Sequence, residues 1–468
     1  MTATSLDRSP VRSCAPAPQL PRLGLLLIAL TAQAPAWALL PIEHWQQDSG
    51  AKVWLVESQA LPMVDVRIQF DAGSRRDPAG KAGLAQATAS LLTKGTAARQ
   101  SQRALNEDQL GQAWADLGGQ FSASASNDAL QFSLRSLTDP ALLEPAVQLA
   151  ARQIGHPAWP AAVWQRDRQR WIASLAEART RPSTLASEAF AQAVYGSHPY
   201  GYQISPQSLQ RITVQDMRRF YADAVRACRA HATVVGKVNR EEADRIVQQL
   251  LANLPATPGS TCPPLADIGP VAALEQASEK TIPVASTQTT IVLGQPGIQR
   301  DDPDFFAMLV GNHILGGGGF TSRLMQEVRE KRGLVYGVYS DFNPGRHAGA
   351  FSISLQTRND QAPQALQLVR EVLTDFVQNG PTEAELQAAK DNLIGGFALR
   401  LDSNAKLLGN VSNIAWNGLP LDYLDTWTER VEALGTDDIH RALQKHLNPE
   451  HMATVIVGQT AAPQPSTP

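Results

Sequence analysis

The sequence has little cysteine and no excess of charge of either sign. Three cysteines occur in 468 residues, and 41 lysines and arginines stand against 44 aspartates and glutamates, which leaves a net charge of -3. No CxxC pair or cysteine–histidine spacing indicates a structural zinc site. Without a basic surface there is no electrostatic reason to bind nucleic acid. We therefore expect a globular chain with no nucleic-acid partner.

Long apolar runs are also absent, except for one near the start. Arg22 precedes "LGLLLIALTAQAPAWA", which ends in Ala36-Trp37-Ala38, the small-x-small pattern that a signal peptidase reads. The apolar part is too short for a permanent membrane-spanning helix, and no second apolar stretch follows. We expect a cleaved signal peptide over residues 1–38, no membrane span afterwards, and a periplasmic or secreted protein. An uncleaved membrane anchor is the alternative.

The cysteines are compatible with an exported chain, but the sequence does not show whether they form a disulfide. Cys14 would leave with the signal peptide, so the mature chain keeps Cys228 and Cys262. An exported protein can hold disulfides. The pair is interpreted either as one bridge or as two buried thiols.

The remaining sequence repeats itself. It reads "HATVVGKV" from 231 and "HMATVIVGQ" from 451, and each segment follows an expected helix with a Thr-led start. Asp216 and Asp438 are separated by 222 positions, as are Gly236 and Gly458. A constant offset of this kind predicts two copies of one domain.

Each copy alternates strands rich in β-branched residues with long helices of 3.6-residue period. Strand pairs such as "QFSASAS" with "ALQFSLRSL", and "VYGVYSDF" with "GAFSISLQT", are adjacent in sequence, which is typical of antiparallel sheets. The fold class predicted is α+β, with two homologous domains that each have a largely antiparallel sheet backed by helices. The predicted parts are a signal peptide (1–38), a first domain (39–255), a linker (256–274), a second domain (275–458) and a disordered tail (459–468).

Three motifs carry a family resemblance. The run "AGSRRDPAGKAGLAQATASLLTKGT" resembles the pitrilysin (insulinase) family of zinc peptidases, whose pattern there is Gly-Leu-Ala-His-x-x-Glu-His and then Lys-Gly-Thr. "YGSHPYG" at 195–201 and the block "GGGGFTSRLMQEVREKRGLVYGVYS" at 316–340 resemble the same family. The resemblance covers nearly the whole mature chain, and it implies that the two domains form half of a clamshell.

The zinc motif of that family is missing here. Two histidines one helical turn apart bind the ion, a glutamate beside the second polarises the bound water, and a later carboxylate completes the ligands. In this sequence these positions hold Gln86, Ala89, Ser90 and, by alignment, Ser174, with Glu177 one turn further along. We expect no metal in this chain. The alternative is that the run was never a zinc helix and its residues merely suit a helix.

The second domain keeps two residues that matter in the family. An Arg and a Tyr seven positions apart there face the zinc, and they match Arg329 and Tyr336. A guanidinium and a phenol can hold a substrate carbonyl and stabilise an oxyanion. The alternative is structural: basic residues before Gly333 form a helix C-cap, and Tyr336 begins a strand.

A glycine run precedes this pair. The resemblance implies that Gly316, Gly317, Gly318 and Gly319 form a flexible loop that contacts or gates the peptide. The alternative is a plain tight connection between helices.

Two functions follow as hypotheses. In the first, the chain is the zinc-free subunit of an exported heterodimeric peptidase: a homologous partner brings the zinc, this chain brings Arg329 and Tyr336, and unfolded peptides bind by adding a strand to a sheet edge. In the second, the chain is a non-enzymatic peptide-binding or scaffold protein. Only the first requires Arg329 and Tyr336.

Overall fold

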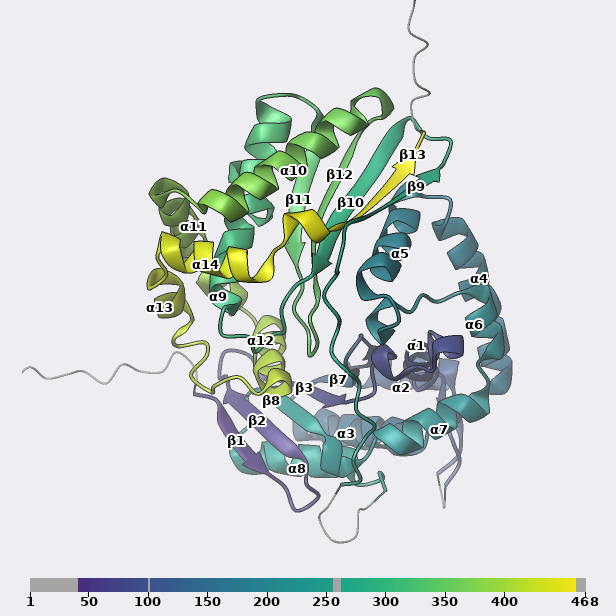
Figure 1. Cartoon of the computed structure of the whole chain (residues 1–468). Helices are drawn as coiled ribbons and strands as arrows, with labels where there is room; N and C mark the ends of the chain where they lie inside the picture. The colour runs from purple at the N-terminus through teal and green to yellow at the C-terminus, as the bar shows by residue number, and fades with distance from the viewer. Residues whose placement is uncertain (1–40, 100–101, 256–261, 460–468) are drawn as a thin grey trace, which may run out of the picture. The chain divides into compact units, whose positions relative to one another are not determined.

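The chain contains two copies of the repeat, called here the first half (residues 41–255) and the second half (residues 262–459). Each half contributes one large β-sheet (Figure 1). The computed structural model describes residues 41–99, 102–255 and 262–459. The segment Leu39–Pro468 forms one compact unit. The predicted signal peptide and most of the predicted tail lie outside the described residues. No helix in the described ranges has the length and apolar character needed to cross a membrane.

The first sheet has the strand order β1-β2-β8-β3-β7-β6. Its strands are β1 (Glu43–Gln46), β2 (Lys52–Glu57), β3 (Met63–Phe70), β6 (Gln120–Ala125), β7 (Leu130–Leu137) and β8 (His231–Gly236). All neighbours pair antiparallel except β2 and β8. A separate two-stranded ribbon joins β4 (Gly95–Thr96) to β5 (Leu105–Asn106).

The second sheet repeats this design with the order β11-β12-β10-β13-β9. Its strands are β9 (Ser278–Pro283), β10 (Gln288–Pro296), β11 (Val335–Phe342), β12 (Ala350–Arg358) and β13 (Ala453–Gly458). Again one pair is parallel, β13 with β9, and the other pairs are antiparallel. The predicted α+β class with two antiparallel-rich sheets is therefore confirmed.

Helices cover both sheets. The first half contributes α1 (Leu84–Leu91), α2 (Glu107–Asp116), α3 (Pro140–Gly155), α4 (Ala161–Ala178), α5 (Pro182–Tyr195), α6 (Pro206–Arg211), α7 (Val214–Ala224) and α8 (Arg240–Leu251). The second contributes α9 (Phe305–Asn312), α10 (Ala362–Asn379), α11 (Glu383–Gly395), α12 (Asn404–Asn417), α13 (Trp427–Glu432) and α14 (Thr436–His446). The Thr-led start is correct for α7, which Thr213 caps, but α14 is capped at Gly435, with Thr436 as its first helical residue.

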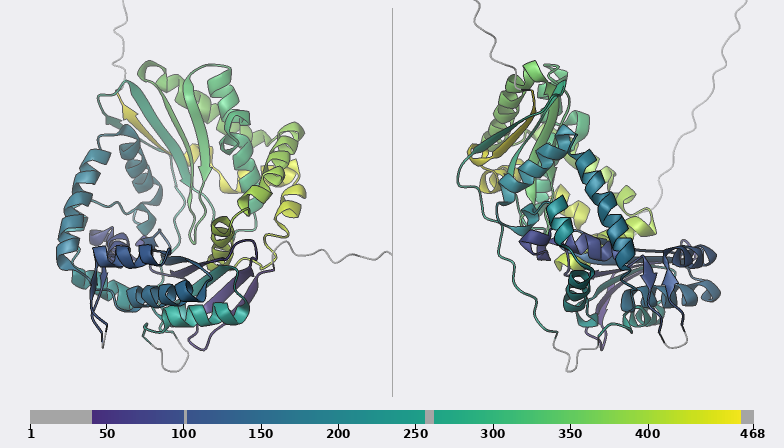
Figure 2. Two further views of the ribbon diagram at one scale, coloured as in Figure 1. Left: turned by 180° about the vertical axis from the view of Figure 1, so that it is seen from behind. Right: turned by 90° about the vertical axis from the view of Figure 1, so that its right-hand side faces the viewer.

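The two halves exchange one helix each. Helix α5 of the first half packs on β10 and β13 of the second sheet, where Phe190 is buried with Val292 and Val455 (Figure 1 and Figure 2). Helix α12 of the second half packs on β8 and β3 of the first sheet. Both helices begin at equivalent positions of the repeat, 182 and 404. Each sheet is thus covered in part by the other half, which makes the halves depend on one another for burial of apolar surface.

The cysteine pair is bridged. Cys228 and Cys262 form a disulfide with 5.8 Å between their Cα atoms. The bridge ties the end of the first half to the segment that leads to the second sheet. The predicted domain and linker boundaries remain predictions.

Candidate functional site

Helix α1 carries the positions of the expected zinc helix, and a buried carboxylate holds its start. Asp77 accepts hydrogen bonds from the backbone N–H groups of Gly83 (2.8 Å), Leu84 (3.1 Å) and Ala85 (2.9 Å). Gly83 has a φ of 98°, a left-handed conformation that suits glycine. Burial raises the pKa of Asp77 to about 7, although the three N–H donors act in the opposite direction.

The residues at the zinc-ligand positions lack the groups that bind zinc. Gln86 and Ser90 are one turn apart and half-buried, so they share a face of α1. Ala89 is fully buried in the core of the first sheet. The Oε1 atom of Gln86 is buried without a hydrogen-bond partner among the described residues. An amide, a methyl group and a hydroxyl offer neither the imidazoles nor the carboxylate of a catalytic zinc site.

The third ligand position lies on α4. Ser174 and Glu177 are exposed there, whereas Trp164, Trp171 and Leu175 of the same helix pack in the apolar cluster that contains α1. A carboxylate at Glu177 without two imidazoles would not hold a catalytic zinc.

The described residues contain one other group with metal-ligand chemistry, Asp302, Asp304 and His446 in the second half. Asp304 already contacts the Lys445 ammonium (2.6 Å) and His446 Nε2 (2.7 Å). Because the Lys445 ammonium neutralises the Asp304 carboxylate, these three side chains form an ion-pair network that needs no metal ion to balance its charge.

Arg329 and Tyr336 lie together in the second half. Arg329 sits on a π-helical turn, Met325–Glu330, and Tyr336 is on β11. The guanidinium carbon of Arg329 lies 5.5 Å from the centre of the Tyr336 ring and 4.7 Å from the centre of the Phe320 ring. Glu330 forms an ion pair with Arg329 at 3.3 Å. Two aromatic rings therefore orient the guanidinium, as cation–π contacts do.

The phenol is open to a ligand, and the Arg329 side chain is partly so, with 27% of its surface exposed. Tyr336 is 86% exposed and Phe320 is 65% exposed, which is unusual for large aromatic residues. Guanidinium and phenol are both hydrogen-bond donors, so together they can hold a carbonyl or an oxyanion. Cap geometry explains part of this segment as well, because the N–H of Gly333 donates to the carbonyl of Arg329 at 2.8 Å.

The glycine run has a packing role. An added Cβ at Gly316 would lie 2.4 Å from the Ser340 backbone nitrogen on β11, and one at Gly318 would lie 2.7 Å from the carbonyl oxygen of His313. Close approach therefore explains these glycines within and beside the π-helical turn His313–Gly317. Gly319, with a φ of 65°, leads directly into Phe320. A peptide-contacting role for residues 316–319 remains a prediction.

One edge of the first sheet, which pairs with no strand in the described ranges, lies beside α1. Strand β6 is the last strand of the first sheet and pairs with β7 on one side. Its side chains alternate between exposed and half-buried, and α1 packs next to it. The outer edge can accept an extended peptide through backbone hydrogen bonds.

Two residues of this site were not identified from sequence. Phe320 follows the glycine run in the motif block, but its ring contact with Arg329 depends on how the π-helical turns pack on β11. Asp77 lies six positions before the cap residue Gly83, a distance at which helix capping is not predicted from a simple pattern. The sequence signal for this cap was the dipeptide Asp77-Pro78, which precedes Gly80 and Gly83.

Comparison with known proteins gives a consistent result. Residues 52–207 match the model of the insulinase family (peptidase family M16), and residues 211–393 match the model called peptidase M16 inactive domain. A crystal structure of a peptidase M16 inactive domain from Pseudomonas fluorescens is 38% identical, with a TM-score of 0.84, and the match covers 91% of this chain and 100% of that one.

More distant matches agree with this family. The non-peptidase homolog YmxG of Helicobacter pylori is 23% identical over 416 residues, which are 88% of this chain and 93% of the relative. The periplasmic protease PqqL of Escherichia coli is 16% identical, with a TM-score of 0.75 over 90% of this chain and 45% of that one.

Proposed function

The chain belongs to the insulinase family (peptidase family M16), as an inactive member without its zinc-binding residues, and we propose that it completes the active site of a zinc-bearing homologue. The two chains form a heterodimeric metallopeptidase in the periplasm or outside the cell. The partner supplies the zinc and the general base. This chain supplies Arg329 and Tyr336, and the substrate is an unfolded peptide.

The observation that carries the proposal is the arrangement around Arg329. Phe320 and Tyr336 hold a guanidinium in place at an exposed surface, while α1 has lost every zinc-binding group. A purely structural arginine would be expected to pair with buried carboxylates or carbonyls. Here the one ion pair of Arg329 among the described residues is with its exposed neighbour Glu330.

The chemistry assigned to this chain is hydrogen-bond donation. When a metal-activated water attacks a peptide carbonyl, negative charge develops on the carbonyl oxygen. The guanidinium and the phenol donate to that oxygen and stabilise the charge, a contribution that commonly amounts to about 3–4 kcal/mol for one donor. The free edge of β6 holds the extended peptide through its backbone, so sequence preference is loose.

The test is peptide hydrolysis by the chain alone, by its nearest homologue with an intact zinc motif from the same organism, and by the mixture. Activity should appear or rise strongly only in the mixture. Arg329→Ala and Tyr336→Phe should each lower kcat/KM by about 100- to 1,000-fold. Arg332→Ala and Tyr339→Phe are matched controls, because both are exposed residues of the same segment and are expected to behave as wild type.

The same experiment distinguishes the proposal from a second candidate, a non-enzymatic peptide-binding or scaffold protein. That candidate needs the β6 edge but not the Arg–Tyr pair. If the mixture is no faster than the homologue alone, or if the two variants retain full activity while peptides still bind, the scaffold function replaces the proposal.

A further inference from the structure

The repeat allows the two halves to be compared position by position. Helix α3 begins at 140 and α10 at 362, so the two helices have the same offset of 222 as the final strands β8 and β13. The strand order β2-β8-β3-β7 corresponds to β9-β13-β10-β12, with the parallel pair in the same place. Each element that covers one sheet therefore has an equivalent place on the other.

In the first half, α8 follows β8 and closes one face of the sheet. It packs against α3 and β2, and its residues Ala243, Ile246, Val247 and Leu250 are buried in the core of the first sheet. Its Gln249 side chain donates to the Glu144 carboxylate of α3 at 3.0 Å. An amphipathic helix is thus the element that this face requires.

In the second half, no described helix follows β13. The next residues, 460–468, read "TAAPQPSTP", and three of them are prolines.

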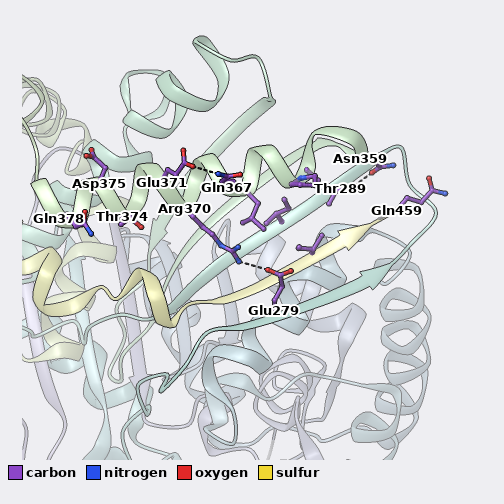
Figure 3. Close-up of a pocket in the computed structure, with 15 residues that line it drawn as sticks. Glu279, Thr289, Asn359, Gln367, Arg370, Glu371, Thr374, Asp375, Gln378 and Gln459 are labelled. Atoms are coloured by element: carbon purple, nitrogen blue, oxygen red, sulfur yellow. Dashed lines mark hydrogen bonds and ion pairs between the residues drawn. The ribbon is translucent and has the colours of Figure 1, made fainter. Parts of the chain in front are cut away.

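The corresponding face carries a groove of about 880 Å³ between α10 and strands β9, β10 and β13 (Figure 3). Ile291, Leu366 and Ile456 form its apolar floor. Ile291 and Ile456 are direct partners in the β10–β13 ladder. Leu366 lies 222 positions after Glu144, the residue through which α3 contacts α8. The groove therefore occupies the place that α8 fills in the first half.

The rim of the groove is acidic. Glu279 pairs with Arg370 across the groove at 3.0 Å, so these two charges cancel (Figure 3). Glu371 contacts Gln367 at 2.9 Å and has no ion pair among the described residues. Asp375 is exposed and forms an ion pair with Arg323 at 3.2 Å. Arg323 also pairs with Glu385, so one arginine is shared by two carboxylates. Lysine or arginine beside an apolar stripe would complement this rim.

We propose that this groove is a docking site for an amphipathic helix of another polypeptide. The helix presents apolar side chains at i, i+3/i+4 and i+7 to the floor, and basic side chains to Glu371 and Asp375. It takes the place in the second half that α8 takes in the first. The proposal does not depend on the Arg–Tyr pair, so it can hold for a peptidase subunit and for a scaffold protein.

The test uses a labelled helical peptide and fluorescence anisotropy. The probe is the α8 sequence, residues 239–252, with Glu241→Lys, Glu242→Lys and Asp244→Lys, and a scrambled peptide of the same composition is the control. The purified chain should bind the probe saturably, and the scrambled peptide should not bind. Thr374→Trp, which fills the groove, should weaken binding at least about tenfold, and Glu371→Lys should weaken it and reduce its salt dependence.

Controls separate this outcome from others. Glu57→Lys reverses an exposed charge on β2 outside the groove and should leave binding unchanged. Equal binding of the scrambled peptide, absence of saturable binding, or binding that neither Thr374→Trp nor Glu371→Lys alters would overturn the proposal. So would a large gain in affinity on deletion of residues 460–468, which would identify the tail as occupant, or a dimer dissociated by Thr374→Trp, which would identify a second copy.

Discussion

His231 Nδ1 lies 3.1 Å from the carbonyl oxygen of Ala415, and this contact joins the two halves of the repeat. His231 is on β8 of the first sheet, and Ala415 is on α12 of the second half. The imidazole is also stacked on Trp54 at 5.4 Å and meets the edge of Trp416 at 5.5 Å. Burial in this contact region disfavours the charged imidazole.

The first prediction concerns acid stability. Burial lowers the pKa of His231 to about 4, whereas an unfolded histidine titrates near 6.5. The unfolded chain therefore binds more protons between these values. The stability linked to His231 is complete above about pH 6.5 and is lost as the pH falls toward 4, by about 3 kcal/mol in total. Urea unfolding at several pH values should show a weaker acid dependence for His231→Asn than for wild type.

Surface histidine His440 is the control for that experiment. It is half-buried on α14, apart from the contact between the halves, so His440→Asn should keep the acid dependence that comes from His231. If His231→Asn and wild type lose stability in parallel between pH 6.5 and 4, the assignment of a neutral His231 in the folded chain is wrong.

The second prediction concerns Asp77 and has the opposite sign. Its pKa is raised to about 7, so the folded chain binds more protons than the unfolded chain between about pH 4 and 7. Stability linked to Asp77 is present below about pH 4 and is lost as the pH rises to about 7, by no more than about 1.4 kcal/mol per pH unit. Relative to Asp77→Asn, wild type should therefore lose free energy of unfolding across this range.

This comparison requires single variants, because His231 and Asp77 partly cancel in wild type. A free-energy difference between wild type and Asp77→Asn that stays constant from pH 4 to 7 would show that the three N–H donors outweigh burial. The variant also gives up part of the cap at α1, which adds a pH-independent loss of about 1 kcal/mol.

The third prediction follows from the exchanged helices. Phe190 on α5 is buried against the second sheet, and Phe190→Ala should lower the free energy of unfolding by about 3–5 kcal/mol. Hydrogen exchange should accelerate most at β10 and β13, although the substitution is in the first half. Phe220→Ala on α7 is the matched control, because Phe220 packs in the clusters of the first half and should affect β2 and β3 instead. Exchange at β10 and β13 that is unchanged in Phe190→Ala would contradict the exchange of helices.

The repeat and the strand pattern predict much of this fold from sequence, and the helix exchange shows where prediction stops. The offset of 222 and the alternation of strands with helices are local signals, and they locate both sheets. Which sheet α5 or α12 covers is a tertiary choice, since either apolar face could pack on either sheet. The apolar pattern of α5 alone does not indicate which of the two sheets it packs on.

The residues of the candidate site can likewise be predicted from sequence only in part. Spacing within a motif locates Arg329 and Tyr336, and the missing imidazoles at Gln86 and Ser90 are visible at once. The ring of Phe320 on Arg329 is not, because it depends on a π-helical turn that brings residues nine positions apart face to face. Non-standard turns of this kind are frequent at functional sites and are poorly encoded in local propensity.

The last prediction tests Phe320 as the residue that positions Arg329. Phe320→Ala removes one of the two aromatic contacts of the guanidinium, and an exposed cation–π contact contributes about 0.5–1 kcal/mol. In the mixture with the zinc-bearing homologue, kcat/KM should fall about two- to fivefold, and Phe320→Tyr, which keeps a ring, should retain activity. Since Phe320 is 65% exposed, stability should change by less than about 0.5 kcal/mol.

A spectroscopic readout makes the Phe320 test independent of hydrolysis. With labelled arginine, the Nε–H resonance of Arg329 should shift in Phe320→Ala because it loses the ring current of one aromatic face. Leu399→Ala removes another exposed apolar side chain and should leave the resonance in place. A shift without loss of activity would mean that the Phe320 ring lies on Arg329 but is not needed to position it for catalysis, whereas no shift would show that this contact is not formed in solution.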